Sequence, residues 1–352
     1  MIKGLKFFLL LLLIIVAGYI YKSNNIGSVT HSIIATMWQG VVMGRTLTGG
    51  LGKILPSKVT SEDILSKGEN IVFLETTDRM QVPSLVLCAI ESAARVYPDR
   101  QVVFFMKGLN HTNSEDDAKR ALSHYPTLSS LENVHIYPLN IEELFNNTPL
   151  LQWYTKVDNS QEKFWTHVKS DGCRLAVIWK YGGIYMDSDV ISLRPIPNRN
   201  FLASEASGQC TNSVFGFPAR HNFPWIFMED FVKKYNGNVW GNQGPILFTR
   251  VFATICPLPN YKGVEDLTCG NISLLHPQRF YPIGYPGWRS YYKVWDKLPA
   301  FNYSHGLHLW NFMNRIERID MVPGSNTLIE HLYQQYCPST YAAIQRNAST
   351  YI

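Results

Sequence analysis

The chain has 352 residues, of which 46% are apolar and 17% charged, and its formal net charge is +5. This composition is that of a globular protein and excludes a disordered or fibrous chain. The charge is modest and Lys and Arg form no dense run, which argues against nucleic-acid binding.

The N-terminus carries an unbroken apolar run from Phe7 to Tyr21, with Lys3 and Lys6 before it and Lys22 after it. The run is shorter than the roughly 20 residues that span an average bilayer, and its length also suits a cleaved secretory signal. Because no small-x-small cleavage pattern follows it and early secretory membranes are thin, we favour an uncleaved signal anchor with its lysine-flanked end in the cytosol. Both interpretations place the rest of the chain in the lumen or outside the cell.

Sequons and cysteines agree with a lumenal location. An oxidising compartment permits disulfides, and the absence of C-x-x-C and of a His cluster argues against a zinc site. Cys256 and Cys269, on either side of a Pro-rich loop, are the favoured disulfide pair, and other pairings stay open. The five N-x-S/T glycosylation sequons begin at Asn110, Asn146, Asn271, Asn302 and Asn347.

Residues 22–67 are rich in Gly, Ser and Thr and are typical of a stem between an anchor and a domain. Regular patterns begin at Ile71–Glu75, a short apolar run that predicts a strand. Leu85–Val96 has helical spacing, and Gln101–Met106 and Val134–Leu139 predict two further strands. Strand, helix and strand at this spacing indicate a βαβ unit with a parallel sheet.

A second helix is expected to start near Lys169 and to end at Gly182 and Gly183, because glycine supplies the left-handed C-cap. A very short strand, Ile184–Met186, then runs directly into the triplet Asp187-Ser188-Asp189. After the triplet, Pro, Gly and aromatic residues become dense, which predicts a loop-rich region that forms the site.

The triplet carries the chemistry. Two carboxylates at the carboxyl end of a short strand suit Mg²⁺ or Mn²⁺, hard cations that bridge protein carboxylates to substrate phosphates. The carboxyl edge of a sheet is also where α/β proteins bind ligands. A D-x-D triplet alone also occurs as a solvated turn. The apolar strand and the helix that precede Asp187 and Asp189 favour the metal site over that alternative.

The segment Ser170–Val190 resembles the D-x-D sugar-binding region of the α1,4-glycosyltransferase family, and the similarity covers about residues 68–345 in order. Other segments that look like the family are Cys88–Arg95, Phe104–Leu109, Thr148–Tyr154, Phe231–Pro245, His308–Asn311 and Tyr336–Ala343. The resemblance implies an α/β fold of GT-A type, a single Rossmann-like catalytic domain without a G-x-G-x-x-G loop. It also implies a UDP-sugar donor, a metal that is usually Mn²⁺ (or Mg²⁺), and retention of the α configuration.

The match looks closest to the galactosyltransferase branch. It implies transfer of galactose from UDP-galactose to a glycosphingolipid such as lactosylceramide. The alternative is transfer of N-acetylgalactosamine or N-acetylglucosamine to glycolipid or glycoprotein glycans. The protein is then a single-pass type II protein of the Golgi membrane, with a cytoplasmic tail (1–6), a transmembrane signal anchor (7–21), a stem (22–67) and a lumenal catalytic domain (68–352).

Within this family, Asp187 and Asp189 are expected to hold the metal and so to be the catalytic pair. His308 is a candidate third metal ligand or diphosphate contact, and the alternative for it is a core histidine. Asp171 and Arg174 match the family's donor-binding pair. Since they stand three residues apart on a helix, they share a face, and a structural ion pair is the alternative.

Four further residues are expected near the donor. Gly182 and Gly183 would let the backbone approach the UDP-sugar, unless they only stop the helix. Asn242 and Gln243 would face the sugar, unless they form a turn. For retention, front-face attack is preferred to a covalent intermediate, for which Glu205 is a possible carboxylate. A metal-dependent phosphohydrolase and a non-catalytic glycan-binding module are the rival classes.

Overall fold

The computed structural model describes residues 61–109 and 122–346, which belong to one compact unit, Val59–Ile352. The predicted tail, anchor and most of the stem lie outside the described residues, as do the sequon residues Asn110 and Asn347. No helix of the described ranges is long and apolar enough to cross a membrane. The last residues of the predicted stem form helix α2 (Ser61–Ser66), which buries Ile64 in the core.

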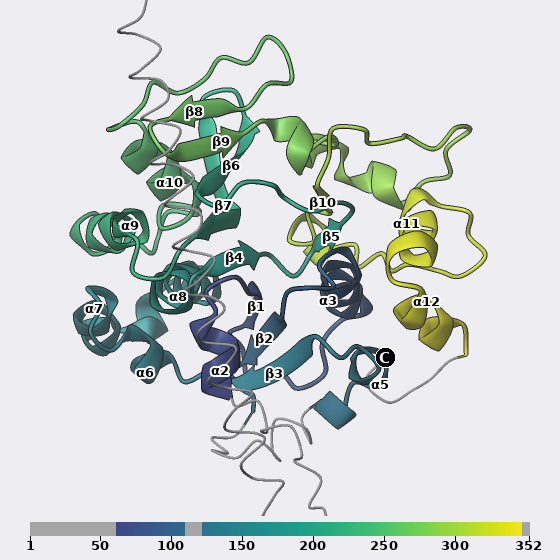
Figure 1. The fold of residues 1–352 in the computed structure, drawn as a ribbon, viewed down its shortest axis with the longest axis horizontal. Helices are drawn as coiled ribbons and strands as arrows, with labels where there is room; N and C mark the ends of the chain where they lie inside the picture. The colour runs from purple at the N-terminus through teal and green to yellow at the C-terminus, as the bar shows by residue number, and fades with distance from the viewer. Residues whose placement is uncertain (1–60, 110–121, 347–352) are drawn as a thin grey trace, which may run out of the picture. The chain divides into compact units, whose positions relative to one another are not determined.

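Within the described ranges, eight strands form one mixed sheet in the order β3-β2-β1-β4-β7-β6-β9-β8 (Figure 1). Strands β1 to β4 run parallel to one another, whereas β7 pairs antiparallel with both β4 and β6. The sheet strands are β1 (Ile71–Glu75), β2 (Val102–Met106), β3 (Val134–Pro138), β4 (Gly183–Met186), β6 (Phe201–Ala206), β7 (Gln209–Phe217), β8 (Leu267–Cys269) and β9 (Ile272–Leu275). A small second sheet pairs β5 (Val190–Ser192) with β10 (Gly306–His308).

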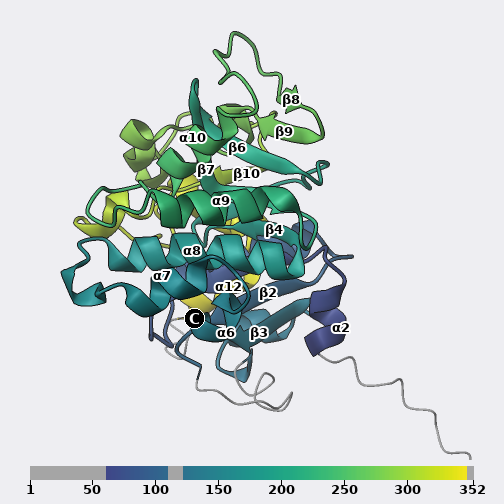
Figure 2. The same ribbon diagram turned by 90° about the vertical axis from the view of Figure 1, so that its left-hand side faces the viewer.

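Helices cover both faces of the main sheet. The predicted βαβ unit is confirmed: β1 and β2 pair in parallel, with α3 (Ser84–Val96) between them in the chain. Every residue of β1 and β2 is buried, which explains why both strands are apolar except for Glu75 at the end of β1. Figure 1 shows α8 and α9 on one side of the sheet and α3 on the other, and Figure 2 shows α7, α8 and α9 on the face turned to the viewer. Besides α2, the helices of that face are α6 (Ile141–Phe145), α7 (Leu150–Lys156), α8 (Trp165–Tyr181), α9 (Asn222–Lys233) and α10 (Pro245–Phe252).

The remaining helices lie on the α3 side. There α5 (Pro126–Ser129) packs under α3, while α11 (Leu328–Tyr336) and α12 (Pro338–Gln345) pack with α3 and the small sheet in a third apolar cluster. The short 3₁₀ helices are η1 (Asn159–Gln161), η2 (Pro277–Arg279), η3 (Tyr285–Tyr292) and η4 (Met313–Arg315).

The region after the triplet is more regular than the sequence predicted. The loop-rich prediction suits Phe280–Trp288, which is coil and 3₁₀ helix, but it was wrong for residues 201–252, which form β6, β7, α9 and α10. The reason is visible in β7, where the polar run Thr211-Asn212-Ser213 interrupts an apolar strand pattern and is nevertheless buried. Those polar side chains face the site described below.

Two disulfides connect distant and local parts of the chain. The favoured Cys256–Cys269 pair is confirmed. A second bridge, Cys88–Cys337, joins α3 to the start of α12 across 249 residues. Cys173 and Cys210 are buried and unpaired. The described sequon residues Asn146, Asn271 and Asn302 are all exposed, as glycosylation requires.

Candidate active site

The two aspartates of the triplet lie at the carboxyl end of β4, in the middle of the main sheet (Figure 1). The peptide N–H of Asp187 donates to the carbonyl of Ser213 on β7 at 2.7 Å, which holds the triplet to the sheet. Strand β5 follows immediately, and its pairing with β10 brings His308 beside the triplet. The N–H of Leu309 also donates to the carbonyl of Asp189 at 2.9 Å. Two segments far apart in the sequence therefore meet at the triplet.

Each carboxylate of the triplet bonds to the protein through one oxygen and directs the other toward His308. Asp187 Oδ1 accepts a hydrogen bond from the Tyr185 hydroxyl at 2.6 Å, and Asp189 Oδ2 accepts one from the N–H of Asn311 at 2.8 Å. The other two oxygens, Asp187 Oδ2 and Asp189 Oδ1, lie 3.9 and 3.4 Å from His308 Nε2. Ligand atoms of the three side chains lie within 4.8 Å of one another, so they form a donor set suited to a divalent cation.

Arg174 on α8 supplies charge that keeps Asp187 ionised. Its Nη1 lies 2.8 Å from Asp187 Oδ1 and donates to the carbonyl of Asn212 at 2.9 Å, while the guanidinium lies 4.7 Å from the ring centre of Tyr185. Burial acts to raise the pKa of Asp187 because it disfavours the charged form. The positive charge of Arg174 and the contact with His308 outweigh burial, and the pKa of Asp187 is lowered. Asp187 is therefore in the ionised form that a cation requires.

The orientation of His308 is set by its backbone neighbour. Its Nδ1 accepts a hydrogen bond from the N–H of Trp310 at 3.2 Å, so Nε2 faces the two carboxylates. Burial acts to lower the pKa of His308, but Asp189 and Asp187 outweigh it and raise the pKa above its ordinary value. Since metal ligation needs an unprotonated nitrogen, a cation here competes with a proton for Nε2.

Asp171 lies one turn before Arg174 on α8 and is bonded to the same network. Its Oδ1 accepts a hydrogen bond from Asn212 Nδ2 at 2.7 Å and lies 3.6 Å from Arg174 Nε. Burial raises the pKa of Asp171 to about 6, against the opposing influence of Arg174 and Asn212. The two α8 residues thus do share a face, and Arg174 connects Asp171 to the triplet.

A cavity of about 510 Å³ opens over these groups, a size typical of small-ligand sites. Its floor is charged and its mouth is aromatic. It is lined by His167, Asp171, Arg174, Asp187, Asp189, Glu205, Thr211, Asn212, Ser213, Trp240, Gly241, Pro245, Tyr285, His308, Trp310, Phe312, Met313 and Arg315.

Glu205 brings a fourth carboxylate to the cavity wall. It stands near the end of β6 and is partly buried. Its carboxylate makes no hydrogen bond or ion pair with the side chain of another described residue. Burial raises the pKa of Glu205, and the charge of His308 opposes this. A desolvated, unpaired carboxylate in a cleft is typical of functional positions.

Gly182 and Gly183 lie at the opposite, amino end of β4 and are not among the residues that line this cavity. Both have positive φ, +70° and +103°, and a Cβ on Gly183 would lie 2.2 Å from the carbonyl oxygen of Asn70. Glycine is thus required where the turn between α8 and β4 packs against other backbone segments, with Gly183 against Asn70 just before β1 and Gly182 against Ala219. The position of the two glycines gives no support to the expected contact with the donor.

Asn242 and Gln243 also lie outside the cavity lining. Gln243 is buried, its Nε2 donates to the carbonyl of Phe231 at 2.7 Å, and its Oε1 accepts from the N–H of Asn236 at 3.1 Å. Asn242 Nδ2 donates to the carbonyl of Lys234 at 3.0 Å. Both side chains therefore shape the loop between α9 and α10, in agreement with the turn alternative, and that loop carries Trp240 into the cavity wall.

Sequence reasoning missed several residues of the site. Tyr185 and Asn212 hold the charged network together, and Trp240 and Tyr285 stand at the cavity mouth. One available signal was the polar run around Asn212 inside an apolar strand. Tyr185, Trp240 and Tyr285 could be recognised only in the tertiary structure, because a single aromatic residue has no distinguishing sequence pattern.

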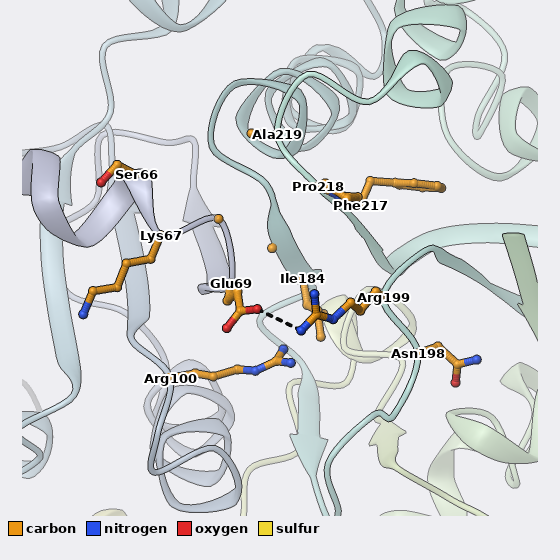
Figure 3. Close-up of a pocket in the computed structure, with 12 residues that line it drawn as sticks. Ser66, Lys67, Glu69, Arg100, Ile184, Asn198, Arg199, Phe217, Pro218 and Ala219 are labelled. Atoms are coloured by element: carbon orange, nitrogen blue, oxygen red, sulfur yellow. Dashed lines mark ion pairs between the residues drawn. The ribbon is translucent and has the colours of Figure 1, made fainter. Parts of the chain in front are cut away.

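A second hollow, of about 320 Å³, lies at the amino end of β4. Figure 3 shows Arg199 paired with Glu69 there, with Arg100 nearby. Arg199 Nη2 lies 3.2 Å from Glu69 Oε1, and the two side chains are 80% and 56% exposed. This pocket lies beside the close packing of Gly183 against Asn70, and its ion pair faces solvent.

Comparisons with known proteins agree with a sugar-transferring site. The family described as "Glycosyltransferase sugar-binding region containing DXD motif" matches residues 83–207, and "Alpha 1,4-glycosyltransferase conserved region" matches residues 216–344. The chain is 53% identical to the alpha-1,4-N-acetylglucosaminyltransferase of Homo sapiens, over 80% of this chain and 82% of that protein. It is 37% identical to the lactosylceramide 4-alpha-galactosyltransferase of Homo sapiens, over 78% and 77%.

The chain is a glycosyltransferase, and it belongs to the α1,4-glycosyltransferase family whose conserved region it carries. It is not a metal-dependent phosphohydrolase or a non-catalytic glycan-binding module. The D-x-D motif of this class implies a divalent metal and a UDP-sugar donor, and the donor set around His308 suits such a metal. Among solved structures, galactosyltransferase LgtC with donor and acceptor analogs covers 72% of this chain and 98% of its own, at 13% identity. Its TM-score of 0.37 is too low to carry an argument.

Proposed function

We propose that the protein is a retaining, metal-dependent α1,4-N-acetylglucosaminyltransferase, which moves the sugar of UDP-N-acetylglucosamine to a glycan acceptor. The donor is supported by the 53% identity to an α1,4-N-acetylglucosaminyltransferase, against 37% to a galactosyltransferase of the same family. Galactose, which the sequence favoured, is therefore replaced by N-acetylglucosamine as the expected sugar, and galactose becomes an outcome of the test.

The arrangement of the triplet carries the proposal. One free oxygen of Asp187 and one of Asp189 lie beside His308 Nε2, on the floor of a cavity large enough for a substrate. We assign these three residues as ligands of Mn²⁺, with Mg²⁺ as the alternative. When bound, the cation neutralises the charge that develops on the departing diphosphate.

The protein's own groups prepare this site. Arg174 keeps Asp187 ionised, and the Tyr185 hydroxyl, which donates to Asp187 Oδ1, helps to fix the orientation of the carboxylate. Asp171 and Asn212 form a buried, hydrogen-bonded pair on the cavity wall, which we assign to hydroxyls of the donor sugar. Fixed polar groups of this kind need no rearrangement during the reaction and so favour the transition state.

In the reaction, the acceptor hydroxyl oxygen forms a bond to C1 of the sugar, and the bond from C1 to the diphosphate oxygen breaks. UDP leaves with the electron pair, and the hydroxyl proton passes to the departing diphosphate. We assign front-face attack, in which both events occur on one side of the ring. Glu205 is the carboxylate available to a two-step route, and a covalent sugar adduct on Glu205 would establish that route instead.

The proposed location is the Golgi membrane, with residues 7–21 as a type II signal anchor and a lumenal catalytic domain of GT-A type at about 68–352. The exposed sequon residues and the two disulfides support a lumenal domain, because both modifications arise in the secretory pathway. The α/β mixed sheet with its D-x-D triplet at the carboxyl edge supports the GT-A type.

A donor panel tests the proposal. The full chain is produced in a secretory host, solubilised in detergent, and offered UDP-N-acetylglucosamine, UDP-N-acetylgalactosamine or UDP-galactose with Mn²⁺. The acceptors are methyl N-acetyl-β-lactosaminide and lactosylceramide. We expect the fastest transfer from UDP-N-acetylglucosamine, loss of turnover in chelator and recovery with Mn²⁺. Transfer from UDP-galactose alone would reverse the donor assignment, and turnover that persists in chelator would end the metal assignment.

A further inference from the structure

Two pairs of aromatic rings form the mouth of the cavity. In one pair Trp240 and Phe312 are nearly parallel, with ring centres 6.0 Å apart and an interplanar angle of 21°. In the other, Tyr285 meets the edge of Trp310 at 6.1 Å and 70°. The outer rings of the pairs, Trp240 and Tyr285, are 51% and 53% exposed. Leaving large rings in solvent forgoes about 25 cal/mol per Å² of apolar surface, so their exposure at a substrate cavity requires an explanation.

The inner ring of each pair has further contacts. Phe312 lies against the guanidinium of Arg315, 4.1 Å from its ring centre, and packs nearly perpendicular to His167 with ring centres 4.6 Å apart. Trp310 donates its indole N–H to the carbonyl of Ile283 at 2.8 Å and lies 4.6 Å from the ring of His308. Trp240 and Tyr285 therefore pack against rings that make contacts of their own with the cavity wall.

Both pairs are connected to the catalytic floor. The turn that carries Trp310 donates to Asp189 through the N–H groups of Leu309 and Asn311. The loop that carries Trp240 reaches the donor side at Gly244, where an added Cβ would lie 3.0 Å from Asp171 Oδ2. The rings are thus held at a defined position relative to the groups assigned to the donor.

The chemistry of the rim differs from that of the floor. An anion such as a diphosphate is repelled by the negative face of an aromatic ring. A neutral pyranose has one face made of C–H groups, which packs on such a ring, and hydroxyls around its edge that stay hydrated. The acceptor sugar is attached to a larger glycan and has to enter from the open side, which is where the exposed rings stand.

We propose that Trp240 and Tyr285 form the acceptor subsite, where the neutral terminal hexopyranose of a glycan stacks with its reacting hydroxyl directed to the floor. This inference rests on the proposed function and adds the residues that select the acceptor. Asn242 and Gln243 are then positioning residues, because they fix the loop that presents Trp240.

The test compares alanine substitutions of the two exposed rings at the cavity mouth with an alanine substitution of an equally exposed aromatic residue outside the cavity. The full chain carries Trp240→Ala, Trp240→Phe or Tyr285→Ala, and the control is Tyr303→Ala, whose ring is also 53% exposed but does not line the cavity. Initial rates are measured with UDP-N-acetylglucosamine and the acceptor of the panel that gives the most turnover. Hydrolysis of UDP-N-acetylglucosamine without acceptor is measured in parallel and reports that each variant is folded.

We expect the two rim alanine variants to raise the acceptor KM about tenfold, which corresponds to about 1.4 kcal/mol, while the donor KM changes less than about threefold. Trp240→Phe should recover most of the loss, and Tyr303→Ala should match the parent. An unchanged acceptor KM in both alanine variants would overturn the proposal. A raised donor KM with an unchanged acceptor KM would also overturn it and would assign the rings to the uracil base. A parent that neither transfers nor hydrolyses any UDP-sugar would instead refute the proposed function.

Discussion

The two ends of β4 differ in how they hold charge. At the carboxyl end, β4 leads into a cavity of about 510 Å³ whose charged floor is bonded into one network. At the amino end, a hollow of about 320 Å³ is lined by charged side chains that face solvent (Figure 3). In the first, the side chains of Arg174 and Asp187 are 9% and 23% exposed, and in the second those of Arg199 and Glu69 are 80% and 56% exposed.

This difference in burial has an energetic meaning. A buried ion is stable only when partners and hydrogen bonds replace its lost water, so the Arg174–Asp187 pair needs the groups around it. An exposed ion pair contributes about 0 to 1 kcal/mol and is readily replaced. Both pockets have charged side chains in their walls. They differ in whether those side chains are buried and joined to one another by hydrogen bonds and ion pairs.

The largest expected effect follows from removing a metal carboxylate. Asp187→Asn should lower the rate of sugar transfer about a thousandfold, about 4 kcal/mol in the barrier, because one charged ligand is lost and Arg174 loses the nearer of its two carboxylate partners. Transfer is measured as in the donor panel, with circular dichroism to confirm folding. At the amino end, Glu69→Gln should change the rate less than about twofold. Similar losses in the two variants would remove the distinction between the ends of β4.

The next effect concerns stability. Gly183→Ala should destabilise the protein by about 3 kcal/mol or more, because the new methyl meets the carbonyl of Asn70 at 2.2 Å and φ is +103°. Gly208→Ala is the matched control: φ is +72° but no atom lies within 4 Å of the added Cβ, so about 1 kcal/mol is expected. Urea unfolding measures both. A stable Gly183→Ala protein with a raised donor KM would support the donor contact and contradict the packing role.

The smallest effect is a pH dependence at the carboxyl end. Burial raises the pKa of Asp171 from 3.8 to about 6, so the folded protein binds its proton more tightly than the unfolded chain does. The bound proton stabilises the folded protein by up to about 3 kcal/mol. This stabilisation is complete below pH 4 and is lost as the pH rises through about 6. The free energy of unfolding is measured by urea unfolding at several pH values in chelator. Asp171→Asn should remove this loss of stability between pH 4 and pH 6. An unchanged loss in the variant would show that Asp171 does not hold the proton.

The site was only partly predictable. Asp187 and Asp189 were recognisable because both stand in one short segment after an apolar strand, and the structure confirms the strand and its end. His308 was named through the family resemblance, and its position beside the triplet depends on the pairing of β10 with β5. Gly182 and Gly183 were expected at the donor because glycine lets the backbone approach a ligand closely, but the length of β4 separates them from the triplet.

Local sequence by itself determined the βαβ unit, the triplet at the end of β4 and the membership of a sugar-transferring family, and it favoured the Cys256–Cys269 bridge without excluding other pairings. These features depend on residues that are neighbours in the chain or on a pattern of side chains repeated along it. Tertiary structure alone decided which oxygens of Asp187 and Asp189 are free, that Glu205 lies in the cavity wall, and that Trp240 and Tyr285 stand at its mouth. Those facts arise from contacts between segments separated by many residues, and such contacts depend on how whole strands and helices pack.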